Sequence, residues 1–234
     1  MIPLLGPSDD FPPVDRALDE PNGLLAAGGG LGVARLRDAY TRGIFPWFSE
    51  GDPVLWWYPN PRMVLPTDAV HVSQSMKRRL RQADFTVTMD RAFAEVLTAC
   101  AAPRRDGPGS WLVPSMLRAY QRLFEAGVAH SIEVWINNTL AGGLYGVAVG
   151  RMFYGESMFS RQPNGSKIAI ITLAAQLARW DFPWIDCQMR TEHLASLGAH
   201  DLPRERFTRE VARLVHEPGV AAPWVLDADL ARTR

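Results

Sequence analysis

One stretch in the second half of the 234-residue chain constrains the fold more than any other, because it carries the clearest β-strand pattern. Residues 131–136 and 139–150 are rich in β-branched, aromatic and small apolar side chains, and the pair Asn137-Asn138 separates them. Two such runs joined by a two-residue turn predict a β-hairpin. Residues 152–160 predict one more strand, so this part of the chain is expected to form an antiparallel meander.

Helical patterns lie on both sides of this meander. Before it we predict a helix over residues 73–82 capped by Ser73, a strand over 85–89, a helix over 90–100 with Asp90 as its N-cap, and a helix over 114–127 that ends at Gly127. After it we predict an apolar helix capped by Asn164 or Ser166 and running to Trp180, a strand over 184–189, a loop over 194–201 and a helix over 203–215.

The order of these elements indicates the fold class. An antiparallel meander followed by a crossover helix and a further strand predicts an α+β, or mixed α/β, fold with a central sheet between helices. The order suits an acetyltransferase-like fold, although order alone does not establish it.

The first sixty residues differ in composition from the rest. They are rich in Pro, Gly and Trp, and apart from a helix over 33–42 we expect them to be irregular. Their aromatic residues predict a small, rigid N-terminal lobe. We therefore expect a lobe over residues 1–62 and a second domain over 63–234.

Composition narrows the class of protein. Apolar residues make up 47% of the chain and charged residues 21%, as in ordinary globular proteins. No apolar run reaches the ~18 residues of a membrane-spanning helix, and the N-terminus lacks the pattern of a secretory signal. The two cysteines, Cys100 and Cys187, form no CxxC pattern, so we expect neither a disulfide framework nor a zinc site. A soluble cytoplasmic protein is predicted.

The formal net charge is zero, which argues against a protein that coats nucleic acid through bulk charge. A local basic cluster is present nevertheless, formed by Lys77, Arg78, Arg79 and Arg81. Such a cluster is either a solvated helix face or a site for phosphate groups.

Two strands carry candidate catalytic groups. Glu156 lies in the aromatic segment GESMFS, where burial would raise its pKa and make it a usable base or acid, unless it faces solvent. In the strand over 184–189, alternation places Asp186 and Gln188 on one face. That face is either a polar site or the solvent side of an edge strand.

Other chemistry has weaker support. The five histidines show no HxxxH or HxH spacing, so no metal is expected, and neither a P-loop nor a G-x-S-x-G motif occurs. The glycines at 142, 143, 146 and 150 interrupt a strand pattern, which predicts bulges or a close approach of a ligand to the backbone.

Eight segments of the chain carry a resemblance to a known family. They are EPNGLLAAGG from Glu20, AYTRGIFPWF from Ala39, LWWYPNPR from Leu55, AHSIEVW from Ala129, GGLYGVAVG from Gly142, GESMFS from Gly155, IDCQ from Ile185 and SLGA from Ser196. Taken together, they resemble the bacterial leucyl/phenylalanyl-tRNA–protein transferase family, and the resemblance covers essentially the whole chain. It implies a small N-terminal domain joined to an acetyltransferase-like domain, and no coenzyme A, other cofactor or metal.

The resemblance also implies an activity, namely transfer of Leu or Phe, less readily Met, from aminoacyl-tRNA to proteins that begin with Arg or Lys. The product would be marked for regulated degradation. Because an aminoacyl-tRNA ester is already activated, no ATP site is needed. A monomer is expected, since nothing in the sequence suggests an obligate oligomer.

Roles for individual residues follow from the resemblance. It places Gln188 at the reacting amine, oriented by Asp186. Because a neutral amide is a very weak base, we expect Gln188 to position the amine or take part in a relay, and Asp186 and Glu156 are the two candidate bases. Trp47, Trp111 and Tyr120 would meet the terminal adenosine of the tRNA, and the basic cluster over Lys77–Arg81 would contact the tRNA backbone. The aminoacyl side chain would enter a pocket for which Leu144, Phe153, Met158, Leu173 and Ile185 are candidates.

Two other functions fit the sequence less well. An acyl-CoA N-acetyltransferase would need a pyrophosphate loop, and the segment 161–167 does not match one. A non-catalytic RNA-binding module fits poorly with the zero net charge and with a polar pair on an apolar strand.

Overall fold

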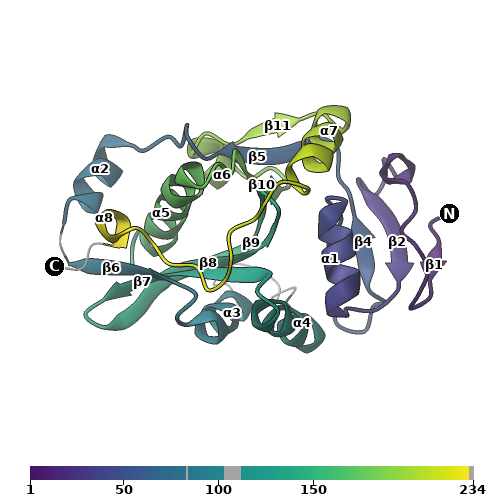
Figure 1. The fold of residues 1–234 in the computed structure, drawn as a ribbon, viewed down its shortest axis with the longest axis horizontal. Coiled ribbons are helices and arrows are strands. Elements are labelled where there is room, and N and C mark those ends of the chain that lie inside the picture. The colour runs from purple at the N-terminus through teal and green to yellow at the C-terminus, as the bar shows by residue number, and fades with distance from the viewer. Residues whose placement is uncertain (83, 103–111, 232–234) are drawn as a thin grey trace.

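The computed structural model describes residues 1–82, 84–102 and 112–231, which form a small and a large β-sheet (Figure 1). The small sheet lies at the N-terminal end, with α1 (Val33–Thr41) beside it. Its strand order is β1-β2-β4-β3, with β1 over Leu4–Leu5, β2 over Leu24–Gly28, β4 over Leu55–Trp57 and β3 over Phe45–Pro46. A short 3₁₀ helix, η1, covers Val14–Arg16.

The large sheet has the order β11-β5-β10-β9-β8-β7-β6. Its neighbouring strands are antiparallel except β9 and β10, which are parallel and are connected through α5 (Gly165–Arg179). The mixed α/β class expected from the sequence is confirmed. The strands are β5 (Arg62–Pro66), β6 (Phe85–Met89), β7 (Ala129–Ile136), β8 (Thr139–Val149), β9 (Met152–Ser160), β10 (Trp184–Gln188) and β11 (His200–Leu202).

Local signals predicted most of these elements correctly. The hairpin β7–β8 turns at Asn137 and Asn138, which have φ values of 50° and 57° as a tight hairpin turn requires. Ser73 caps α2 by accepting a hydrogen bond from the Met76 amide. The helices of this region are α2 (Gln74–Leu80), α3 (Phe93–Ala101), α4 (Pro114–Glu125), α6 (Glu192–Ser196), α7 (Arg204–Leu214) and α8 (Ala228–Ala231). None of the helices in the described ranges has both the length and the apolar character needed to cross a bilayer.

Two expectations about irregular segments were wrong. The first sixty residues contain the small sheet, and the segment predicted as a loop over 194–201 contains the end of α6 and the start of β11. Both errors have the same cause, because these strands are two to five residues long and depend on distant partners. β11, for example, pairs with β5, which lies far earlier in the chain.

The expected helix cap of α3 was also wrong. α3 begins after Ala92, whereas Asp90 has a φ of 55° and its carboxylate accepts hydrogen bonds from the Ser131 and Trp224 amides at 2.9 and 2.7 Å. Asp90 therefore connects β7 to the C-terminal segment, two residues before the N-cap position of the helix. At α5, Asn164 occupies the N-cap position as expected but without a side-chain hydrogen bond, and Ser160 Oγ accepts the Ser166 amide at 2.8 Å.

Buried side chains form two clusters on opposite faces of the large sheet. Along β5, Met63 and Leu65 belong to the cluster beneath α5, while Val64 between them belongs to the other cluster, as strand alternation requires. The second cluster also includes Tyr40 and Trp56. The small sheet therefore shares a core with one face of the large sheet. In the structure the small sheet ends at Trp57 and β5 begins at Arg62; the two-domain division at residue 62 stays a prediction.

Two of the β8 glycines have a clear structural reason. A Cβ atom at Gly142 would lie 2.5 Å from the backbone of Gly165, so the start of α5 packs directly on the strand. Gly146 adjoins an irregularity in the β8–β9 pairing, which confirms the expected bulge. At Gly142 the close neighbour is thus a helix rather than a ligand.

Candidate active site

A cavity of about 540 Å³ lies where β9 and β10 separate. The ladder between these strands pairs Ile185 with Phe153 and Asp186 with Tyr154. Just beyond, Glu156 is an extra residue in the β8–β9 pairing and Cys187 is an extra residue in the β5–β10 pairing. Because a bulge re-aims the side chains around it, the two bulges open a space between adjacent strands.

One part of this cavity is apolar. The five residues that the sequence suggested for a side-chain pocket all line it, namely Leu144, Phe153, Met158, Leu173 and Ile185. They come from β8, β9, α5 and β10, and four of them are buried core residues beneath α5. The structure therefore brings this predicted set together.

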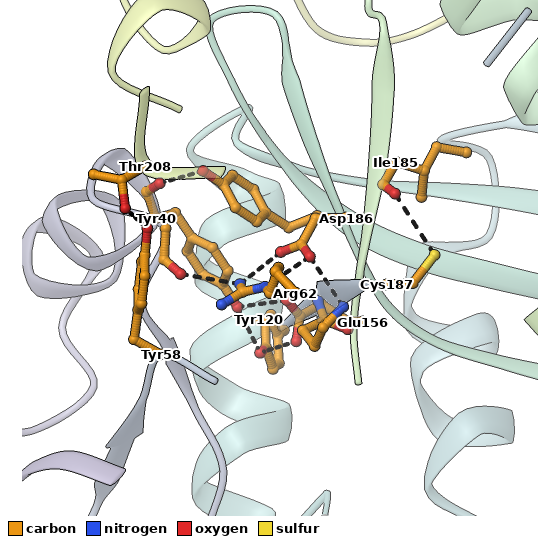
Figure 2. Close-up of polar contacts among 12 residues, drawn as sticks. Tyr40, Tyr58, Arg62, Tyr120, Glu156, Ile185, Asp186, Cys187 and Thr208 are labelled. Carbon is orange, nitrogen blue, oxygen red and sulfur yellow. Dashed lines mark hydrogen bonds and ion pairs between the residues drawn. The ribbon is translucent and has the colours of Figure 1, made fainter. Parts of the chain in front are cut away.

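Glu156 lines the same cavity and is held by two tyrosines (Figure 2). The Tyr40 hydroxyl donates to Oε1 at 2.7 Å and the Tyr120 hydroxyl donates to Oε2 at 2.6 Å. Burial raises the pKa of Glu156 to about 7, and the two tyrosine hydrogen bonds oppose this rise only in part. The carboxyl group therefore exchanges its proton near neutral pH, as a general base or acid requires.

Asp186 is placed differently from the expectation. Its side chain is fully buried against Arg62, whose Nε and Nη2 donate to Oδ1 and Oδ2 at 2.8 and 2.6 Å (Figure 2). Among the described residues that line the cavity, Gln188 is present and Asp186 is not. The prediction that the two share a face was wrong, because the bulge at Cys187 interrupts the alternation of the strand.

Gln188 occupies an unusual backbone conformation. Its φ is 55°, and the Met189 amide donates to the Cys187 carbonyl at 2.7 Å, which makes Gln188 the central residue of a γ-turn. Asp186 Oδ1 accepts the Gln188 amide at 2.9 Å. Within the described part of the chain, Gln188 Nε2 and Ser157 Oγ are buried without a hydrogen-bond partner, and both residues line the cavity. Buried groups of this kind are available to a ligand.

The aromatic candidates have different positions. Trp47 lines the cavity with 38% of its surface exposed, and its ring centroid lies 5.4 Å from that of Trp57. The Tyr120 ring is fully buried, so in this structure it is closed to stacking on a base and its hydroxyl serves Glu156. Trp111 lies outside the described residues.

The basic cluster lies on α2, at the end of the molecule opposite the small sheet (Figure 1). Lys77, Arg78 and Arg81 are exposed. Arg79 is engaged, because it forms an ion pair with Asp84 at 2.6 Å and its guanidinium lies over the Phe85 ring.

Sequence reasoning missed Arg62 and Tyr40. Both residues lie inside segments that carry the family resemblance, namely LWWYPNPR and AYTRGIFPWF. The one available signal was a charged residue among aromatic and apolar neighbours, because an arginine buried there requires a partner. No group of three or more metal-binding side chains occurs within the described ranges.

Comparison with known proteins identifies the family of the chain. Residues 64–212 match the family model described as leucyl/phenylalanyl-tRNA protein transferase, and residues 29–60 match that of its N-terminal domain. A leucyl/phenylalanyl-tRNA–protein transferase of Thiobacillus denitrificans is 56% identical over 93% of this chain and 96% of its own. One from Nitrosospira multiformis is 53% identical over 97% and 98%.

Similarity to solved structures is lower. A GCN5-related N-acetyltransferase from Kribbella flavida aligns with 70% of this chain and 58% of its own, at 12% identity and a TM-score of 0.36. The two family models, by contrast, match most of residues 29–212, and the two relatives cover 93% and 97% of the chain. The chain therefore belongs to the leucyl/phenylalanyl-tRNA–protein transferase family, a family of aminoacyltransferase enzymes.

Proposed function

We propose that this protein transfers Leu or Phe, and less readily Met, from aminoacyl-tRNA to the N-terminal α-amine of proteins that begin with Arg or Lys. The product would be marked for regulated degradation in the cytoplasm. The observation that carries the proposal is the cavity between β9 and β10, because it joins an apolar pocket to unpartnered hydrogen-bond donors and an ionisable carboxyl group.

The apolar part of the cavity suits the donor amino acid. Five aliphatic, aromatic and thioether side chains surround it, and Met158 adapts to flat and branched side chains alike. Trp47 lies at the same cavity with its indole partly exposed, where it would stack on the terminal adenine. Stacking of this kind contributes about 1–3 kcal/mol. Trp111 would add to it.

The polar part suits the reaction of an amine with an ester. The amine nitrogen attacks the ester carbonyl, the new C–N bond forms, and the bond to the ribose oxygen breaks. Gln188 Nε2 and Ser157 Oγ would donate hydrogen bonds to the carbonyl oxygen as it gains negative charge, which their lack of partners supports. Gln188 is thus a donor in this scheme and not a base.

Glu156 is the better of the two candidate bases. It lines the cavity and has a pKa of about 7, so its carboxylate would accept the proton that the amine loses and then pass that proton to the ribose oxygen as it leaves. Asp186 is buried away from the cavity and both of its oxygens are bonded to Arg62. In this scheme Tyr120 positions Glu156 instead of stacking on adenine.

The remaining contacts concern the tRNA body. The exposed side chains of Lys77, Arg78 and Arg81 would bind its phosphate groups, which gives affinity with little sequence information. Arg79 would contribute less, since Asp84 already neutralises it. We also propose that the protein acts as a monomer.

The test is transfer of labelled Leu from Leu-tRNA to a peptide that begins with Arg, compared with an otherwise identical peptide that begins with Glu. We expect transfer to the first peptide alone. Absence of transfer to either peptide would refute the proposal, and transfer from acetyl-CoA without tRNA would indicate an acetyltransferase instead.

A further inference from the structure

We propose that Arg62 is a positioning residue for the transfer reaction, which sets the geometry of Gln188 through Asp186. The inference rests on the proposed function, in which Gln188 donates to the reacting carbonyl group.

Arg62 joins three distant parts of the chain at one buried point. Its guanidinium makes a two-point pair with Asp186, and Nη2 also donates to the Gly43 carbonyl at 2.9 Å. Gly43 directly follows α1, whereas Arg62 begins β5 and Asp186 lies in β10. A two-point pair fixes the orientation of the carboxylate as well as its distance.

Aromatic rings from the small-sheet region and from the large-sheet region surround the Arg62 guanidinium. Its central carbon lies 4.9 Å from the ring centre of Phe45, 5.5 Å from that of Tyr58 and 4.6 Å from that of Phe207. Phe45 belongs to the small sheet and Phe207 to α7. The flat, delocalised charge of arginine suits stacking and two-point pairing at once, and a lysine ammonium does not.

Asp186 links Arg62 to Gln188 through a shared carboxylate oxygen. The Oδ1 atom that binds Arg62 Nε also accepts the Gln188 amide. A positive φ at a residue other than glycine is strained and persists only where surrounding contacts hold it. Without Arg62 the buried carboxylate would lose its counter-charge and its fixed orientation, so the turn at Gln188 would relax and the side chain would lose its place in the cavity.

A kinetic cycle with Arg62→Lys and Gln188→Ala tests the proposal, using Leu-tRNA and an Arg peptide. In the otherwise native protein, Arg62→Lys is expected to lower kcat about tenfold to a hundredfold, because small displacements of a reacting group have effects of this size. In the Gln188→Ala protein the same change should lower kcat less than about twofold. An equal factor in both proteins would show that Arg62 is merely structural and would overturn the proposal.

Arg213→Met is the matched control. Arg213 is an exposed arginine of α7 that pairs with Glu210 and Glu217, and its loss should leave kcat unchanged. If Arg62→Lys fails to fold, the neutral pair Arg62→Met with Asp186→Asn enters the same cycle, because it leaves no buried charge unpaired. The same lack of additivity with Gln188→Ala is expected, and equal factors would again refute the idea.

Amide hydrogen exchange supplies a measurement that does not depend on activity. Arg62→Lys should accelerate exchange of the Gln188 amide at least about tenfold, and Arg213→Met should not. Unchanged exchange at Gln188 would contradict the proposal. If the native protein transfers no amino acid, the proposed function fails, whereas the exchange measurement still decides the role of Arg62.

Discussion

The raised pKa of Glu156 leads to a quantitative prediction about stability. The pKa is about 7 in the folded protein against an ordinary value of 4.5, a difference worth roughly 3 kcal/mol. Because the folded state holds the proton more tightly than the unfolded state, this contribution is complete below pH 4.5 and is lost as the pH rises through 7. Between pH 5 and pH 8 the expected loss is roughly 2–3 kcal/mol.

The variant Glu156→Gln isolates this effect, because glutamine keeps the shape of the side chain and does not titrate. Urea unfolding of both proteins at pH 5, 6, 7 and 8 gives the difference in their free energies of unfolding, in which the other titrating groups cancel. The difference should shift by roughly 2–3 kcal/mol in favour of the variant at high pH. A difference that stays constant with pH would refute the reasoning that burial raises the pKa of Glu156.

Three further changes test other parts of the structure. Trp47→Ala should raise KM for aminoacyl-tRNA about 5- to 150-fold with little change in kcat, and steady-state kinetics showing a change in kcat alone would contradict a stacking role. Leu173→Ala should lower the free energy of unfolding by about 2–5 kcal/mol. It should also favour Phe over Leu as the donor amino acid, and an equal loss of transfer rate for Leu and Phe would argue against a role of Leu173 in the pocket. Asp90→Ala removes a buried acceptor shared by His130, Ser131 and Trp224. This change should lower the free energy of unfolding, measured in urea, by at least about 3 kcal/mol, and an unchanged unfolding midpoint would contradict the prediction.

Local patterns explain what could be predicted from the sequence. The hairpin β7–β8 has its turn chemistry and its strands within twenty-one residues, and β6 and β9 match the predicted ranges. The helices α4 and α7 were also predicted close to their observed ranges, because their amphipathic pattern is strong. In these elements neighbouring residues alone decide the conformation.

Distant partners explain what could not be predicted. The strands of the small sheet are too short to carry a periodic pattern, and β1 pairs in parallel with a strand about twenty residues later. Asp90 has the residue type of a helix cap, yet tertiary contacts with β7 and the C-terminal segment determine its conformation. The helix start is supported instead by Glu133, which accepts the Ala92 amide.

The residues of the candidate site also fall into a group that local patterns predict and a group that depends on distant contacts. The apolar residues of the pocket could be proposed because they lie in strands and a helix that were themselves predictable. The network around the carboxyl groups could not, since Tyr40 reaches Glu156 across 116 positions and Arg62 reaches Asp186 across 124. Strand alternation, applied to Asp186 and Gln188, failed because no local signal marks the bulge at Cys187.

The contact between Arg62 and Asp186 also has a consequence for the time course of folding. Closing a loop of this length is entropically costly and comes late, after the local hairpins and helices have formed. A chain still being synthesised has its predicted amino-acid pocket incomplete until β10 has left the ribosome. We therefore expect the ability to transfer an amino acid from tRNA to arise late, after β10 has joined the sheet.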